Sequence, residues 1–342
     1  MRTMPAHGLG VAIPSENEDW KATALTLRKS HRSIKYISDR THVSEYAIRK
    51  FFTNENAKGK AKKVTKDGFK VYENLRPNLY KPVWSGNQVL TIALMGDTQI
   101  NSKYTQLTYL HRFYDVCYAR GVHDVYHTGD IDEGEKMRPG HQYECYNQGV
   151  DDHIKEIVRV YPKREGIQTH FIPGNHDASI YKLCGLDLGE LIAQRRSDMH
   201  YLGRDCARIN LTPNCVLELR HPWDGTAYAL SYKPQKMVAA MESDSKPNIL
   251  AIGHYHKVEY LFRRNVHTLQ TGCFQSQTPF TRGKGIETDM GGWTVTIEVD
   301  ADGHIQRFIP ELIPFYKGIT DDYKNWDSSK DESKKLLRTD NH

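Results

Sequence analysis

The sequence predicts a layered α/β domain preceded by a small all-α module, on three observations. Apolar strands alternate with helices over residues 87–316 and end in a β-rich stretch. Residues 20–52 instead carry apolar side chains at helical spacing. A hydrophobic content of 38% supplies a sizeable core, and no apolar run approaches the roughly 18 residues that a membrane-spanning helix needs. At about 150 residues per domain, the 342-residue chain is expected to form two.

The N-terminal module, residues 1–56, is expected to fold as a helix-turn-helix-like unit. Residues 20–29, 33–40 and 45–52 each have helical periodicity, and Ser44 precedes the last segment at the N-cap position. The module is therefore predicted to be all-α.

Two short helices joined by a tight turn, the second capped by serine and carrying basic residues, resemble a helix-turn-helix. The turn contains His42, where this pattern often has glycine. We predict that this module binds DNA through Ser44, Tyr46, Arg49 and Lys50. The alternative is a helical hairpin used for packing or dimerisation.

The net charge of +5 is unevenly distributed. Residues 1–86 carry 17 Lys and Arg against 8 Asp and Glu, so this part has a balance of +9 and the rest of the chain −4. A basic front suggests a polyanionic partner, although a solubilising arm would have the same charge. Five lysines between positions 58 and 66 predict a mobile basic linker over residues 57–86. Residues 317–342 have mixed charge and are expected to form a surface tail.

The α/β domain begins with a continuous apolar run at 89–95, which is typical of a buried strand. Residues 293–299 alternate between apolar and polar side chains, which indicates a half-buried strand. Helices are expected at 104–120 and 151–160. Further strands are expected at 124–128, 169–173, 215–219, 249–253, 259–263 and 266–270.

Polar side chains follow several of these strands, most of them after a glycine that allows a sharp turn. They comprise two carboxylates, two amides and three imidazoles: Asp97, Gln99, Asp130, Asn175, His221, His254 and His256. Hard oxygens mixed with imidazoles suit Mn²⁺, Mg²⁺, Fe²⁺ or Zn²⁺. Because seven ligands are more than one cation takes, we expect two cations about 3.5–4 Å apart with a bridging carboxylate.

The blocks GD, GDxxE, GNHD, a lone His and GHxH, in this order over residues 89–310, resemble the calcineurin-like metallophosphoesterase superfamily. The resemblance implies a layered αββα fold. It also implies that Asp97 and His256 bind one metal, that Asp130 bridges, and that Asn175, His221 and His254 bind the other.

The same resemblance implies that His176 is the catalytic histidine, which stabilises the transition state or protonates the leaving oxygen, and that Asp177 orients it. Gln99 departs from the pattern, because the family usually has histidine there. Its amide oxygen could bind the first metal weakly, or it could hydrogen-bond a metal-bound water. Mn²⁺ is the first expectation for both positions. Asp132 and Glu133, beside the bridge, are expected either to support the site or to lie in a solvated loop.

The expected activity is two-metal hydrolysis of phosphodiester bonds. The basic module favours DNA as substrate and a resemblance to nucleases related to the double-strand-break repair family, from a phage or a bacterium. The alternatives are a small-molecule or phosphoprotein phosphoesterase with a regulatory module, and a non-catalytic DNA-binding protein. Six scattered cysteines without a CxxC pair suggest reduced thiols and a cytoplasmic location. No membrane partner is expected, and the oligomeric state stays open.

Overall fold

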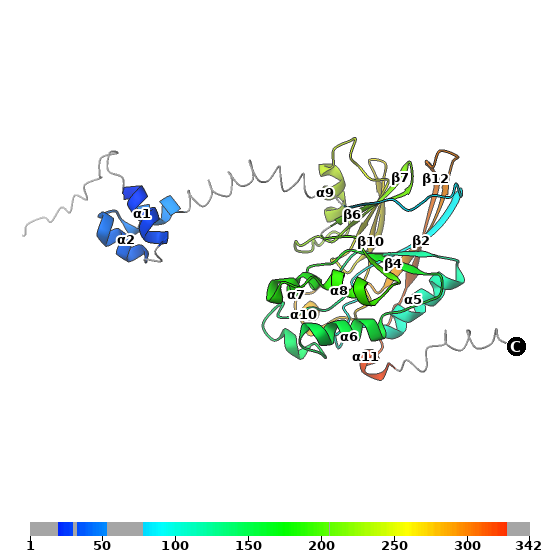
Figure 1. Cartoon of the computed structure of the whole chain (residues 1–342), viewed down its shortest axis with the longest axis horizontal. Helices are drawn as coiled ribbons and strands as arrows, with labels where there is room; N and C mark the ends of the chain where they lie inside the picture. Colours follow the sequence, from blue (N-terminus) through cyan, green and yellow to red (C-terminus); the bar gives the residue numbers. More distant parts are fainter. Residues whose placement is uncertain (1–19, 30–32, 53–77, 205, 327–342) are drawn as a thin grey trace, which may run out of the picture. The chain divides into compact units, whose positions relative to one another are not determined.

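The computed structural model describes residues 20–29, 33–52, 78–204 and 206–326 (Figure 1). The chain divides into two compact units, residues 1–76 and 77–342, and each is described by itself. Among the described helices, none has the length and apolar content to cross a bilayer.

The N-terminal unit contains α1 (Trp20–Lys29), α2 (Ile34–Thr41) and a helix over residues 45–52, as the sequence predicts. Its core is formed by Ala24, Ile37, Val43 and Ile48, each from a different segment. The hydroxyl of Ser44 accepts a hydrogen bond from the Ala47 amide at 3.3 Å, which confirms the expected N-cap.

The turn after α2 is made by His42, whose φ of 56° is left-handed. This conformation explains why glycine is common at the position, since glycine adopts it without steric cost.

The second unit contains two six-stranded sheets. In spatial order the first sheet consists of β12 (Ile305–Pro314), β11 (Gly291–Val299), β2 (Val89–Met95), β3 (Asp124–His127), β4 (Gln168–Phe171) and β5 (Met199–Tyr201). The second sheet consists of β1 (Asn78–Tyr80), β6 (Cys206–Thr212), β7 (Cys215–Arg220), β8 (Ile249–Ile252), β10 (Val266–Thr271) and β9 (Val258–Arg263).

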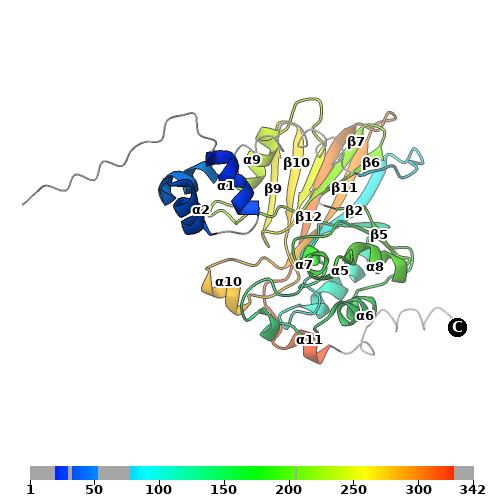
Figure 2. The same ribbon diagram turned by 60° about the vertical axis from the view of Figure 1, so that its left-hand side comes forward.

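The described helices of this unit include those that cover the outer faces of the two sheets. They are α5 (Leu107–Ala119), α6 (Val150–Val160), α7 (Asp177–Cys184), α8 (Leu188–Arg195), α9 (Tyr232–Ala240), α10 (Pro279–Gly283), α11 (Asp322–Asn325) and the 3₁₀ turn His141–Tyr143. In Figure 2, α5 to α8 lie together on one side and α9 lies apart from them, beside β9 and β10.

Three apolar clusters define the layers. Ile92 and Leu94 of β2 pack with second-sheet residues such as Leu217 between the two sheets. Ala93 and Met95 of the same strand point the other way, into the cluster that α5, α6 and α8 cover. The third cluster joins α9 to the outer face of the second sheet. β2 is thus buried on both faces, which explains its continuous apolar run, and the expected αββα layering is confirmed.

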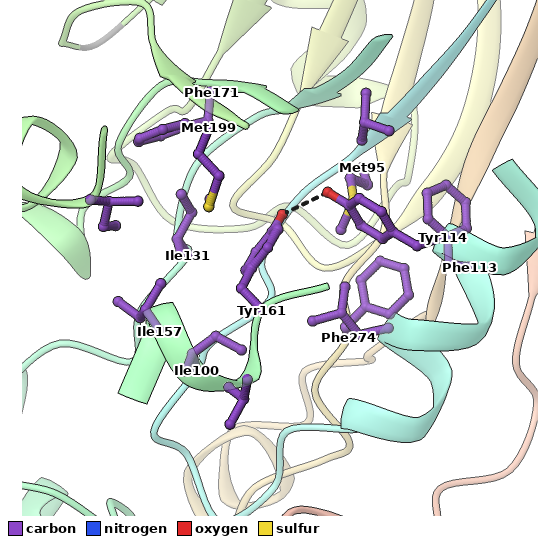
Figure 3. Close-up of a cluster of buried hydrophobic side chains, with 14 of the residues drawn as sticks. Met95, Ile100, Phe113, Tyr114, Ile131, Ile157, Tyr161, Phe171, Met199 and Phe274 are labelled. Atoms are coloured by element: carbon purple, nitrogen blue, oxygen red, sulfur yellow. Dashed lines mark hydrogen bonds between the residues drawn. The ribbon is translucent and has the colours of Figure 1, made fainter. Parts of the chain in front are cut away.

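The helix-covered cluster is rich in aromatic residues (Figure 3). Phe113 packs edge-on against Phe274, with ring centroids 5.5 Å apart. Tyr114 and Tyr161 are buried, and the Tyr114 hydroxyl donates to that of Tyr161 at 3.2 Å and also contacts the Thr169 hydroxyl. Pairing these buried hydroxyls removes the cost of leaving them unsatisfied.

The unit extends further at both ends than the sequence suggests. The expected linker 57–86 contains β1, which pairs in parallel with β6, so the linker prediction is wrong for residues 78–86; residues 57–77 lie outside the described part. At the other end, Asp322 accepts hydrogen bonds from Thr108, and Tyr323 packs into the core, so 317–326 is not a free tail. These contacts join residues that are far apart in the sequence, so the local sequence pattern does not predict them.

Strand direction brings the motif loops together. β2, β3 and β4 are parallel neighbours in the first sheet, and β7 and β8 are parallel neighbours in the second. Carboxyl ends of parallel strands lie at one edge, so the loops after these five strands converge.

Candidate metal centre

The seven expected metal ligands lie on the loops after β2, β3, β4, β7 and β8. Five of them have left-handed backbone conformations, with φ between 50° and 76°: Asp97, Gln99, Asp130, His254 and His256. This conformation is strained for residues other than glycine, and such strain concentrates at functional sites. The strained backbone therefore indicates that the loops are held in the conformation that positions these five side chains.

One group of donors is formed by Asp97 and His256. Asp97 is fully buried, and its Oδ1 lies 3.3 Å from His256 Nε2. Its two carboxylate oxygens also accept from the backbone amide of His254, at 3.0 and 2.9 Å. Asp97 therefore ties the first motif loop to the last.

A second group surrounds Asp130. Its Oδ2 lies 3.3 Å from His221 Nε2, which in turn lies 3.1 Å from Asn175 Oδ1. Ligand atoms of Asp130, His221 and His254 all lie within 4.8 Å of one another. Ligands that bind a cation at about 2.0–2.2 Å are themselves about 3.0–3.4 Å apart, so the pairs at 3.3 and 3.1 Å have a spacing compatible with a shared cation.

Backbone carbonyls hold the imidazoles of His221 and His254. His221 Nδ1 lies 2.8 Å from the carbonyl oxygen of Thr128, and His254 Nε2 lies 2.6 Å from that of Asp224. A carbonyl accepts the ring proton, so the opposite nitrogen keeps its lone pair for a cation. His254 would therefore bind through Nδ1 and His221 through Nε2.

Gln99 sits between the two groups. Its Nε2 donates to Asp130 Oδ2 at 3.2 Å, while its Oε1 is buried and has no hydrogen-bond partner among the described residues. A buried carbonyl oxygen without a partner costs free energy unless a cation or water meets it. This orphaned oxygen is a free donor beside Asp130, so the residues present fit a cation, met either directly or through a bound water.

Glycine makes the close packing of the loops possible. A Cβ on Gly174, which precedes Asn175, would overlap Asp130 Oδ1. Gly129 has a φ of +107°, and a Cβ there would lie 2.6 Å from His221 Nδ1. The glycines before the polar residues therefore serve close approach as well as turning.

The centre is built around a fixed negative charge. Burial opposes ionisation of Asp130, but the neighbouring His221, His176 and His254 lower the pKa of its carboxyl group well below the usual range. Burial likewise opposes protonation of His221, yet Asp130 raises the pKa of that imidazole to about 9. Buried His127, which packs against Thr98, has its pKa lowered to about 4 and lies outside the donor set.

His176 begins the turn into α7, and its backbone amide donates to Asp130 Oδ1 at 2.8 Å. Its ring Nδ1 lies 2.6 Å from the carbonyl oxygen of Glu133. With Nδ1–H donated there, Nε2 is available to the substrate. The side chain lines a cavity of about 350 Å³ over the donors.

Asp177 has a different role from the one expected. Its carboxylate accepts from the backbone amides of Ile131, Asp132 and Gly174 at 2.8–3.1 Å, whereas the His176 ring is held by Glu133. At the first position of α7 the side chain turns back toward the preceding loops. Burial, and next the charge of Asp130, raise the pKa of Asp177 to about 7. Asp177 thus holds the β3 and β4 loops together instead of orienting His176.

Glu133 and Asp132 are buried and not in a solvated loop. Glu133 accepts from Gln275 Nε2 at 2.6 Å and pairs with His141 Nε2 at 2.9 Å. Asp132 accepts from Asn101 and contacts His153 Nδ1 at 2.5 Å. The sequence pattern does not indicate His141, His153 or Gln275, because they lie outside the glycine-led motifs.

Arg138 was also missed. It lines the cavity, forms an ion pair with Glu144 at 2.6 Å and lies 4.4 Å from the ring centroid of Phe280. It thus adds a positive charge to the cavity wall, paired with Glu144.

The four expected nucleic-acid contacts lie in the N-terminal unit. Ser44, Tyr46, Arg49 and Lys50 are all exposed, and Tyr46 is 74% exposed. Arg49 forms an ion pair with Glu45 on the same helix at 3.2 Å.

No protein-family model matches the chain. It is similar to archaeal DNA polymerase II small subunits. That of Methanothermobacter thermautotrophicus is 26% identical over 190 residues, covering 45% of this chain and 39% of that protein. That of Halobacterium salinarum is 23% identical over 267 residues, covering 63% of this chain and 49% of that protein. The chain spans less than half the length of either relative.

Among solved structures, the chain is similar to an archaeal phosphodiesterase, with 12% identity and a TM-score of 0.36 over 66% of this chain and 100% of that one. A predicted phosphoesterase from Streptococcus pneumoniae has 14% identity and a TM-score of 0.33 over 66% and 98%. TM-scores of this size do not support a fold assignment. The assignment rests on the strand order and the motif loops of this chain.

The chain has the layered α/β arrangement that the resemblance to the calcineurin-like metallophosphoesterase superfamily implies. Two sheets packed face to face, outer helices and five motif loops meeting at one edge agree with the resemblance seen in the sequence. The named curated relatives are archaeal, so they do not support the expected phage or bacterial source.

Replacing Gln99 by histidine tests its place in this centre. Gln99→His should tighten the first cation and shift preference toward Zn²⁺ or Fe²⁺, because imidazole is a stronger donor to these ions than a neutral amide. Competition titrations with Mn²⁺ and Zn²⁺ on the intact protein measure the shift. An unchanged metal profile would mean that Oε1 meets water instead.

Proposed function

We propose that this protein is a two-metal phosphodiesterase that acts on DNA. The observation that carries the proposal is the convergence of seven donors from five loops, with Asp130 between the two groups and an unpartnered Gln99 oxygen beside it. Asp97, Gln99 and His256 would hold one cation, Asn175, His221 and His254 the other, and Asp130 would bridge. Mn²⁺ is the proposed native ion for both.

A pair of divalent cations supplies an activated hydroxide at neutral pH and neutralises charge on the phosphate. Side chains of the protein would supply the remaining interactions with the substrate. His176 Nε2, when protonated, can stabilise the developing charge or protonate the leaving oxygen, and the Glu133 carbonyl fixes its ring. Arg138, which lines the same cavity, would orient a phosphate oxygen.

DNA as the substrate is supported by two observations. The N-terminal unit presents exposed basic side chains on a serine-capped helix, and residues 1–86 carry the balance of +9. The curated relatives are named as small subunits of a DNA polymerase. A small-molecule or phosphoprotein substrate is the alternative.

Deleting residues 1–70 separates DNA binding from chemistry. The deletion leaves β1 and every proposed ligand in place, so Mn²⁺-dependent hydrolysis of bis-p-nitrophenyl phosphate should stay nearly unchanged. DNA affinity should fall and depend less on salt, because 15 of the 17 basic residues in the front part are removed. The slope of log affinity against log salt measures phosphate contacts at about 0.9 per contact on duplex DNA.

The double variant Arg49→Ala/Lys50→Ala is the matched test in the full-length chain, and it should weaken DNA binding modestly. If the deletion variant binds and cuts DNA with the same affinity and slope, the module is no DNA anchor. The alternative substrates would then be favoured.

A further inference from the structure

A second cavity lies beside the metal centre and has no part in the proposed chemistry. Its volume is about 320 Å³, within the range of small-molecule sites, and it is formed by α7, the start of α8 and the loops after β5 and β7. Trp223, two residues after the metal ligand His221, lines both this cavity and the one over the donors. One extended substrate could therefore occupy both.

The walls of this cavity carry two aromatic rings, each with a cation against it. Lys182 Nζ lies 4.9 Å from the ring centroid of Trp223, and Arg204 Cζ lies 3.9 Å from that of Tyr181. Trp223 is 52% exposed and Tyr181 is 45% exposed, so each ring keeps free surface for a ligand. Pro173, Ala178 and Leu188 complete a mainly apolar lining.

The acidic groups of the cavity are already satisfied. Asp187 accepts from Arg204 Nε at 2.7 Å, from the Tyr201 hydroxyl at 3.0 Å and from the Gly189 amide at 3.0 Å. Asp177 accepts from three backbone amides of the motif loops. Arg204 is thereby held in position, and neither carboxylate repels a phosphate strongly.

We propose that this cavity is a nucleobase subsite, in which Trp223 and Tyr181 stack on the unstacked base of the nucleotide next to the scissile phosphate. Lys182 and Arg204 supply positive charge for the flanking phosphate. A flat aromatic ring joined to a phosphodiester fits this combination of exposed rings and cations beside a phosphate-cleaving centre. The inference rests on the proposed DNA phosphodiesterase function.

The test uses full-length protein with Mn²⁺ and single-stranded hexanucleotides, each with one base replaced by an abasic residue. An abasic residue next to the cleaved bond should lower kcat/KM for the wild type roughly 5- to 150-fold, the range that base–aromatic stacking supports. In Trp223→Ala and Tyr181→Ala this ratio should approach one. Trp223→Phe should keep most of the discrimination.

Tyr118→Ala is the matched control, because Tyr118 is an exposed aromatic on α5 that lines neither cavity. Metal content is measured on every variant, since Trp223 lies close to His221. Discrimination that is absent in the wild type, or unchanged in both alanine variants, overturns the subsite and leaves DNA hydrolysis standing. If the wild type cuts bis-p-nitrophenyl phosphate but no oligonucleotide, the DNA function fails and the subsite fails with it.

Discussion

Replacing Asp130 by asparagine is expected to reduce turnover by at least about 10³-fold and to weaken both cations. The substitution keeps the shape of the side chain, and its oxygen can still accept from the His176 amide, so only the negative charge is lost. That charge faces Gln99, which lies between the two donor groups, at 3.2 Å and His221 of the second group at 3.3 Å. Stabilisation by the metals is worth several kcal/mol, and each 1.36 kcal/mol changes the rate tenfold. Steady-state kinetics and metal analysis of the same preparation measure both effects.

Asp152→Asn on α6 is the control, because this carboxylate is 61% exposed and lies outside both donor groups. It should leave turnover and metal content unchanged. Near-normal turnover of Asp130→Asn with two metals bound would show that Asp130 does not bridge.

Replacing His176 by alanine should lower turnover about 10²- to 10⁴-fold, the usual range for a positioned acid–base group, and leave metal content largely intact. The variant keeps the backbone amide that donates to Asp130. The hydrogen-bond partner of the His176 ring is a carbonyl oxygen and not a metal donor. Activity and metal stoichiometry, measured together, distinguish chemistry from metal binding.

His123→Ala serves as the comparison, since His123 is exposed and lines a different cavity. Loss of metal from His176→Ala would make His176 a ligand. His176 lies with Glu133 and His141 in a group whose donor atoms are within 4.8 Å of one another, so that result would have a structural basis.

The convergence of the seven polar side chains could be predicted from sequence because each of them lies within a few residues of a strand end. The glycine-led turns and the apolar strands before them are local signals, and parallel pairing carries the loops to one edge. The continuous run of β2 also shows locally that both of its faces are buried.

The contacts that position these ligands could not be predicted in the same way. Thr128 and Asp224 act on His221 and His254 through backbone carbonyls, which every residue possesses. The sequence predicts a linker at β1, because this strand is only three residues long and only its pairing with β6 defines it. The role of Asp177 depends on the position of the β3 loop, which a motif does not specify.

The most direct test of the two-metal centre is anomalous X-ray diffraction from crystals of the full-length protein grown with Mn²⁺. The account predicts two manganese peaks per chain about 3.5–4 Å apart, with Asp130 contacting both. One peak should lie against Asp97, Gln99 and His256, and the other against Asn175, His221 and His254. A single peak, or two peaks without a shared Asp130 carboxylate, would contradict it.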